Sequence, residues 1–213
     1  MTTLAHTYRE ALATILEHTD PDAPTLCEGW TCADLAAHLY VRENDPMGSP
    51  GIIIPPLAGL TRARMDKALA SLGYLGVVDA FAHGPRSWSP MGIPGLDRMA
   101  NGIEFFVHYE DVHRAQEGWS ASELPGPGLS DELWQRLRLS AKFLARKSPV
   151  GLRLERTDVD PAESVAVRPG DQIVTITGTP GELVLWCYGR RAAVDFIGDP
   201  EPVEAVKRMA RGF

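Results

Sequence analysis

The sequence lacks a long apolar run, an excess of basic residues and the layout of a signal peptide, and each absence excludes a class of protein. No apolar stretch approaches the ~20 residues that a transmembrane helix requires. The 213 residues include 21 Lys and Arg against 28 Asp and Glu, which gives a formal net charge of −7. Nucleic-acid binding is not expected, because phosphate is neutralised by clustered basic side chains. The amphipathic N-terminus has no basic-then-apolar order, so we expect a cytoplasmic protein.

Cysteine is also scarce. Cys27, Cys32 and Cys187 are an odd number at unrelated spacings, which fits neither a disulfide framework nor a cysteine-rich zinc site. Cys27 and Cys32 flank an expected helix start, and one of them is a candidate reactive thiol. A buried structural role is the commoner alternative.

Apolar side chains recur at helical spacing through the first two thirds of the chain. They predict helices over residues 3–18, 32–43, 57–72, 96–116 and 130–147, with continuation of the third through residue 81 left open. Thr31 and Asp34 form the pattern of a capping box at the second helix. We expect Gly118 to cap the C-terminus of the fourth helix and Ser130 the N-terminus of the fifth.

The pattern changes after Pro149. Residues 151–158, 164–169 and 171–178 alternate apolar and polar side chains, as half-buried strands do. A short helix over 182–189, a strand over 192–198 and a terminal helix over 202–209 complete the order β-β-β-α-β-α. The sequence therefore predicts an α+β protein with a helical bundle over residues 1–148 and a small α/β domain over residues 149–213.

A metal-ligand pattern lies on the fourth predicted helix. Glu104 and His108 are four residues apart and share one face, while their neighbours Ile103, Phe106 and Val107 are apolar. A buried carboxylate needs compensation, and a divalent cation provides it. His38, on the core-facing side of the second helix, would be a third ligand from a facing helix. Three protein ligands leave positions open, as in catalytic metal sites.

Other interpretations of these residues stay open. A histidine in an apolar helix is commonly a hydrogen-bonded core residue, and a Glu and a His four apart are frequently an exposed pair. His113 is an alternative ligand to His108, although it lies about 140° round the helix from it. We interpret His6, His18 and His83 as surface or loop residues.

Two segments resemble a known family. GWTCADLAAH is similar to the first signature of the mycothiol-dependent maleylpyruvate isomerase group, within the DinB-like superfamily, and EFFVH is similar to its second signature. The stretch WSPMGIPGLDRMANGIEFFVHYEDVHRA resembles an actinobacterial subgroup, and ELVLWCYGR resembles the C-terminal domain of these isomerases, which is similar to sterol-carrier folds. The resemblance implies a DinB-like bundle followed by a sterol-carrier-like domain.

The resemblance also implies a divalent metal, typically zinc, on His38, Glu104 and His108. It further implies an arginine contributed by the C-terminal domain, for which Arg190 and Arg191 are candidates. Mycothiol would be the thiol cosubstrate.

These features favour an enzyme that acts on a small-molecule substrate with a metal and a low-molecular-weight thiol, as an isomerase or an S-transferase. Asn101 and Asp111 would support the ligands, and Arg42 or Arg190 would bind a substrate carboxylate. A surface salt bridge from Arg42 to Glu43 or Asp45 is an equal alternative. A non-catalytic ligand-binding or regulatory module with a structural metal is the second functional hypothesis, and a homodimer is left open.

The loop over residues 83–95 is rich in Pro and Gly and precedes the fourth helix. Its large apolar residues Trp88 and Met91 are predicted to form a wall or lid over the metal and its thiol. Cover over one end of the bundle is the alternative.

Overall fold

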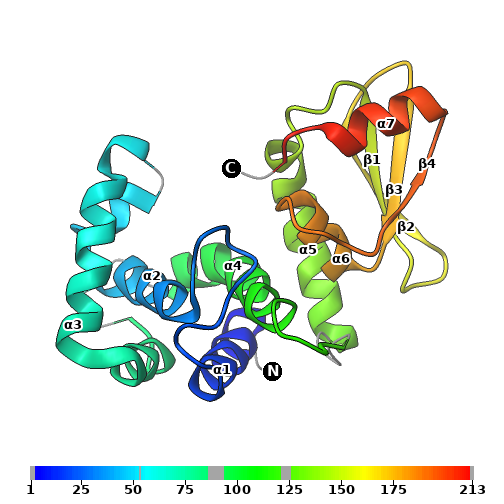
Figure 1. Ribbon diagram of the computed structural model, residues 1–213. Helices are drawn as coiled ribbons and strands as arrows, with labels where there is room; N and C mark the ends of the chain where they lie inside the picture. Colours follow the sequence, from blue (N-terminus) through cyan, green and yellow to red (C-terminus); the bar gives the residue numbers. More distant parts are fainter. Residues whose placement is uncertain (1–2, 53, 86–93, 121–125, 212–213) are drawn as a thin grey trace. The chain divides into compact units, whose positions relative to one another are not determined.

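The computed structural model describes residues 3–52, 54–85, 94–120 and 126–211. The chain forms two compact units, Met1–Ala121 and Ser122–Phe213. The first is helical and the second combines helices with a sheet (Figure 1). Within the described ranges, every helix is too short or too polar to cross a membrane.

The described residues of the first unit form four α-helices. They are α1 (Leu4–His18), α2 (Cys32–Asn44), α3 (Ala58–Ala82) and α4 (Pro94–His113), with 3₁₀ turns η1 (Ser49–Ile52) and η2 (Pro55–Leu57) before α3. Helix α1 packs against α3 and α4, and α2 packs against α3. In the core, the ring of Tyr8 meets that of Phe106 edge-on, with centroids 5.2 Å apart. The apolar faces that the sequence predicts therefore face one another.

Local sequence signals set the start of α2 and the bend of α3. At α2 the Thr31 side chain accepts from the Asp34 backbone, and the Asp34 side chain accepts from the Thr31 backbone, which confirms the predicted capping box. The continuation of the third predicted helix through residue 81 is also confirmed. It is interrupted by a kink at Gly73, whose φ of 70° lies in the left-handed region that favours glycine.

The predicted caps of the fourth and fifth helices are wrong. Helix α4 ends at His113 rather than Gln116, so Gly118, with a φ of 74°, lies in the turn beyond the helix and does not cap it. Helix α5 (Pro127–Leu144) begins three residues before Ser130. Pro127 explains this start, because proline fits the first turn of a helix, where no backbone donor is needed. The Ser130 hydroxyl donates instead to Asp158 at 2.8 Å.

The second unit contains a four-stranded mixed sheet in the order β2-β1-β3-β4. Strand β1 (Gly151–Arg156) pairs antiparallel with β2 (Glu163–Arg168) and parallel with β3 (Ile173–Gly178), and β3 pairs antiparallel with β4 (Asp195–Ile197). Helix α6 (Pro180–Cys187) packs against β1 and β3, and α7 (Pro200–Arg208) packs against β3. The predicted order of elements and the α+β class are confirmed.

Helix α5 belongs to the second unit by its contacts. It packs against α6 and β2, and the Trp134 indole on α5 donates to Glu163 on β2 at 2.8 Å. Asp131 on α5 pairs with the buried Arg156 of β1, also at 2.8 Å. The division at residues 148–149 expected from the sequence separates α5 from the sheet, whereas the compact units divide before α5, after Ala121.

Candidate metal centre

The three predicted metal ligands come together in the first unit. Oε1 of Glu104 lies 3.7 Å from Nε2 of His38 on α2 and 3.9 Å from Nε2 of His108 on α4. One donor atom from each of the three residues lies within 4.8 Å of the others. Two imidazole nitrogens and one carboxylate oxygen are a donor set that suits zinc and similar divalent ions.

The helices explain this convergence. On α4 the four-residue spacing puts Glu104 and His108 one turn apart on the same face, while Phe105 and Phe106 are buried in the core. On α2 the buried His38 lies next to the ring of Trp30, with centroids 5.0 Å apart. The site is thus formed where a polar stripe of α4 meets a histidine inside the bundle.

The second ring nitrogen of His108 also has a partner. Its Nδ1 lies 3.1 Å from Oδ2 of Asp111, whose side chain is fully buried. A carboxylate that holds the far nitrogen of a histidine fixes the orientation and tautomer of the ring, which is how metal-binding histidines are commonly supported. The prediction that Asp111 supports a metal ligand therefore matches a contact in the structure, the one between Asp111 and His108.

Cys27 lies beside the same pair, a position that its place in the sequence does not indicate. Its thiol donates to Oδ2 of Asp111 at 3.1 Å and lies 3.9 Å from Nδ1 of His108. Cys27, His108 and Asp111 form a second group of donor atoms within 4.8 Å of one another. His108 belongs to both groups through opposite ring nitrogens.

The other two cysteines have the properties of structural residues. Cys32 is buried, and burial raises the pKa of its thiol to about 11. Burial raises the pKa of the Cys187 thiol to about 12. Thiols with such pKa values are protonated and unreactive at neutral pH, so Cys27, which is only partly buried, is the cysteine best placed for chemistry.

Arg42 contacts the site from α2. Its Nη2 lies 2.7 Å from Oε2 of Glu104, and its Nη1 donates to Oδ1 of Asn101. The alternative prediction, a surface salt bridge from Arg42 to Glu43 or Asp45, is wrong. Glu43 pairs with Arg9 and Asp45 pairs with Arg64.

Electrostatics favour the protonation states that a metal needs. Burial lowers the pKa of His38, more than the neighbouring Glu104 raises it, so the imidazole is neutral at physiological pH. Burial acts to raise the pKa of Glu104, but the contact with the His38 ring and the charge of Arg42 outweigh it and bring the pKa below its usual range. Neutral imidazole and ionised carboxylate are the ligand forms.

The other predicted residues are not part of the two donor groups described for the first unit. Arg190 is in the second unit, where its guanidinium donates to the Tyr188 carbonyl at 3.0 Å. Trp88 and Met91 fall outside the described residues. His113 stacks on Tyr109 and is part of neither donor group. His6, His18 and His83 are exposed, which confirms them as surface residues.

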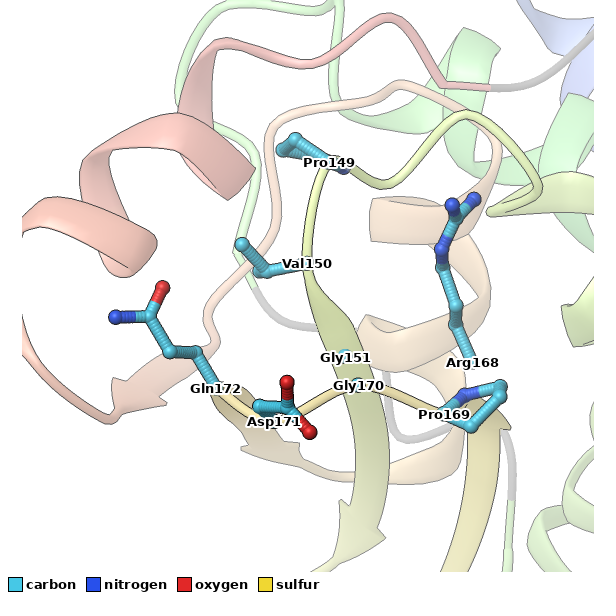
Figure 2. Close-up of a pocket in the computed structure, with 8 residues that line it drawn as sticks. All are labelled: Pro149, Val150, Gly151, Arg168, Pro169, Gly170, Asp171 and Gln172. Atoms are coloured by element: carbon cyan, nitrogen blue, oxygen red, sulfur yellow. The ribbon is translucent and has the colours of Figure 1, made fainter.

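A separate open hollow of about 550 Å³ lies in the second unit (Figure 2). It is bordered by the start of β1 and by the turn between β2 and β3, and its lining residues are Pro149, Val150, Gly151, Arg168, Pro169, Gly170, Asp171 and Gln172. Gly151 and Gly170 pass so close that a Cβ on Gly170 would lie 2.6 Å from the backbone nitrogen of Gly151. The glycines are therefore required by packing, and the donor groups described above lie in the other unit.

Part of the first unit is similar to a known family of domains. Residues 3–45, which include α1, α2 and His38, match the family model of the mycothiol maleylpyruvate isomerase N-terminal domain. The predicted resemblance is confirmed. No curated protein sequence matches the chain significantly.

Two solved structures share the fold. The mycothiol-dependent maleylpyruvate isomerase is 19% identical with a TM-score of 0.52, and a mutant of that isomerase is 18% identical with a TM-score of 0.55. Each alignment covers 92% of this chain and 95% of the solved chain. At this level of identity the similarity establishes a common fold across both units.

Proposed function

We propose that the chain is a metal-dependent enzyme that uses a low-molecular-weight thiol to isomerise a small electrophile or to transfer sulfur to it. The convergence of His38, Glu104 and His108 supports this most directly, because these side chains offer the donor set of a catalytic zinc site. The match of residues 3–45 to the mycothiol maleylpyruvate isomerase N-terminal domain suggests mycothiol as the thiol.

His38, Glu104 and His108 would hold the ion, and Asp111 would orient His108 through its Nδ1. A divalent ion with an open position lowers the pKa of a bound thiol, so that a thiolate nucleophile is available at neutral pH. Burial of His38 and Asp111 excludes water from one side of the site, which strengthens the electrostatic contacts within it.

The proposed reaction begins with the thiolate. It adds to an activated carbon–carbon double bond of the substrate, and the π electrons move to the conjugated carbonyl oxygen. Rotation about the resulting single bond and loss of the thiolate restore the double bond with the opposite geometry. In S-transfer, protonation of the adduct replaces the elimination and the sulfur stays on the product. Either Arg42 or Arg190 remains the predicted contact for a substrate carboxylate.

The test is a turnover assay with the zinc-loaded protein. Maleylpyruvate and other small electrophiles would be incubated with mycothiol, and substrate loss and product geometry would be followed by absorbance and NMR. We expect turnover that depends on both thiol and metal and that is lost in His108→Ala. Glu117→Gln, at an exposed position beyond α4, is the matched control and should retain full activity.

The alternative of a structural metal gives a different result. An ion with four protein ligands and no exchangeable position would leave the thiol unactivated. Stoichiometric zinc together with no thiol-dependent reaction across the electrophile panel would favour the binding module over the enzyme.

A further inference from the structure

A buried polar chain leads from the core of the first unit to the metal site. At its inner end, the Arg9 guanidinium donates to both carboxylate oxygens of Glu43, at 2.5 and 2.6 Å, and to the Phe81 carbonyl at 2.9 Å. Arg9 also lies over the rings of Phe81 and Phe105, at 4.9 and 4.7 Å from their centroids. The hydrogen bonds and the two phenylalanine rings hold the guanidinium in place, and the guanidinium in turn leaves Glu43 little freedom to move.

Asn101 links this pair to the site. Its Nδ2 donates to Oε1 of Glu43 at 3.2 Å, and its Oδ1 accepts from Nη1 of Arg42. The side chain of Asn101 is fully buried, and both ends of its amide are used. The contact with Glu43 fixes which way the amide faces, because only the amino end donates to a carboxylate. The oxygen is therefore directed at Arg42.

Arg42 contacts one of the two carboxylate oxygens of Glu104, and the other oxygen faces the two histidines. Nη2 of Arg42 lies 2.7 Å from Oε2, whereas Oε1 is the oxygen that faces His38 and His108. A carboxylate with both oxygens free can bind a metal through one or both, and the second mode uses a position that a thiol would otherwise occupy. The planar guanidinium donates to Asn101 and Glu104 at once, which a lysine ammonium does not do in one plane.

We propose that Glu43 and Asn101 are positioning residues: together they hold Arg42 on Oε2 of Glu104, so that Glu104 offers only Oε1 to the ion. This inference rests on the proposed metal site and deepens it. It gives Arg42 a role in shaping the ligand set, and it explains why an ion pair, Arg9 and Glu43, is buried behind the site.

The test is titration of the metal-free full-length protein with Co²⁺, followed by visible absorption. The intensity of the Co²⁺ bands falls as the coordination number rises, so the spectrum reports on how Glu104 binds. Asn101→Ala removes the link and leaves the Arg9–Glu43 pair intact. We expect its Co²⁺ affinity to fall about 10- to 100-fold, the usual effect of losing a partner behind a ligand, with weaker absorption per bound ion.

Two further variants complete the design. Thr61→Ala also removes a buried hydrogen-bonding side chain, which donates to the Gly48 carbonyl, and should bind Co²⁺ as the wild type does. Arg42→Lys keeps the charge and most of the volume, and should shift affinity and spectrum in the same direction as Asn101→Ala. It tests the proposal even where Asn101→Ala does not fold.

The outcomes separate the two proposals. Wild-type protein that binds no Co²⁺ would overturn the proposed metal function and the positioning role with it. Wild-type binding that Asn101→Ala and Arg42→Lys both leave unchanged in affinity and absorption would overturn the positioning role alone.

Discussion

Replacing Glu43 by glutamine tests how the buried ion pair behind the site contributes to stability. The side chains of Glu43 and Arg9 are 0% and 10% exposed. Glutamine keeps the shape of Glu43 but not its charge, so the Arg9 guanidinium would remain buried against Phe81 and Phe105 without its carboxylate partner. Breaking a buried pair in this way costs roughly 3–5 kcal/mol.

Urea unfolding of the metal-free protein, followed by circular dichroism at 222 nm, measures this cost. With an m-value of about 2 kcal/mol per M, a loss of that size moves the midpoint of the helical unit down by about 1.5–2.5 M. Arg64→Gln is the control, because Arg64 and its partner Asp45 are 32% and 20% exposed. A pair that is partly in water contributes only about 0–1 kcal/mol.

The double variant Arg9→Met/Glu43→Leu identifies the cause. If the loss in Glu43→Gln comes from an unpaired buried charge, removal of both charges should recover much of it, since apolar replacements of buried pairs are commonly neutral or stabilising. A change below about 1 kcal/mol in Glu43→Gln, equal to that of Arg64→Gln, would refute the reasoning.

Four further predictions concern the site itself. Chelator should lower the melting temperature of the wild-type protein but leave that of Glu104→Ala almost unchanged, because a bound ion stabilises only the folded state; equal shifts would mean that the chelator acts elsewhere. The folded state lowers the pKa of His38, so the unfolded chain binds its proton first and the metal-free protein should lose stability as pH falls through the ordinary histidine pKa of about 6.5. In His38→Gln, the free energy of unfolding should depend less steeply on pH between pH 7 and 5, and exposed His6→Gln is the control. Glu104 has a lowered pKa, so it contributes only at more acid pH. Cys27→Ala should keep full metal content, and loss of the ion in this variant would assign it to the second donor group. Trp88→Ala should weaken thiol binding at unchanged metal content, and unaltered thiol affinity would rule out the lid.

Much of the fold could be predicted because its signals are local. The Thr31–Asp34 capping box and the alternation in residues 151–178 depend on neighbouring residues, and the structure has both. The pairing of Glu104 and His108 follows from helical spacing in the same way. His38 was predicted to join them from its place on an apolar helix face and from the family resemblance.

The missed features depend on contacts between distant segments. Nothing near Glu43 in the sequence indicates Arg9 as its partner, 34 residues away, so the sequence alone leaves Arg42 available to pair with Glu43. Cys27 lies 84 residues from Asp111 in a turn-rich segment whose path the sequence does not fix. The association of α5 with the sheet likewise depends on tertiary contacts, such as that between Trp134 and Glu163.

The metal content of the purified protein tests the central claim most directly. Zinc would be measured by elemental analysis after dialysis, in the wild type and in the double variant His38→Ala/His108→Ala. Because a three-ligand site forms only in the folded chain, we predict about one divalent ion per chain in the wild type and none above background in the double variant. Full occupancy in the double variant, or an empty wild-type protein in the presence of excess zinc, would contradict the assignment of His38, Glu104 and His108.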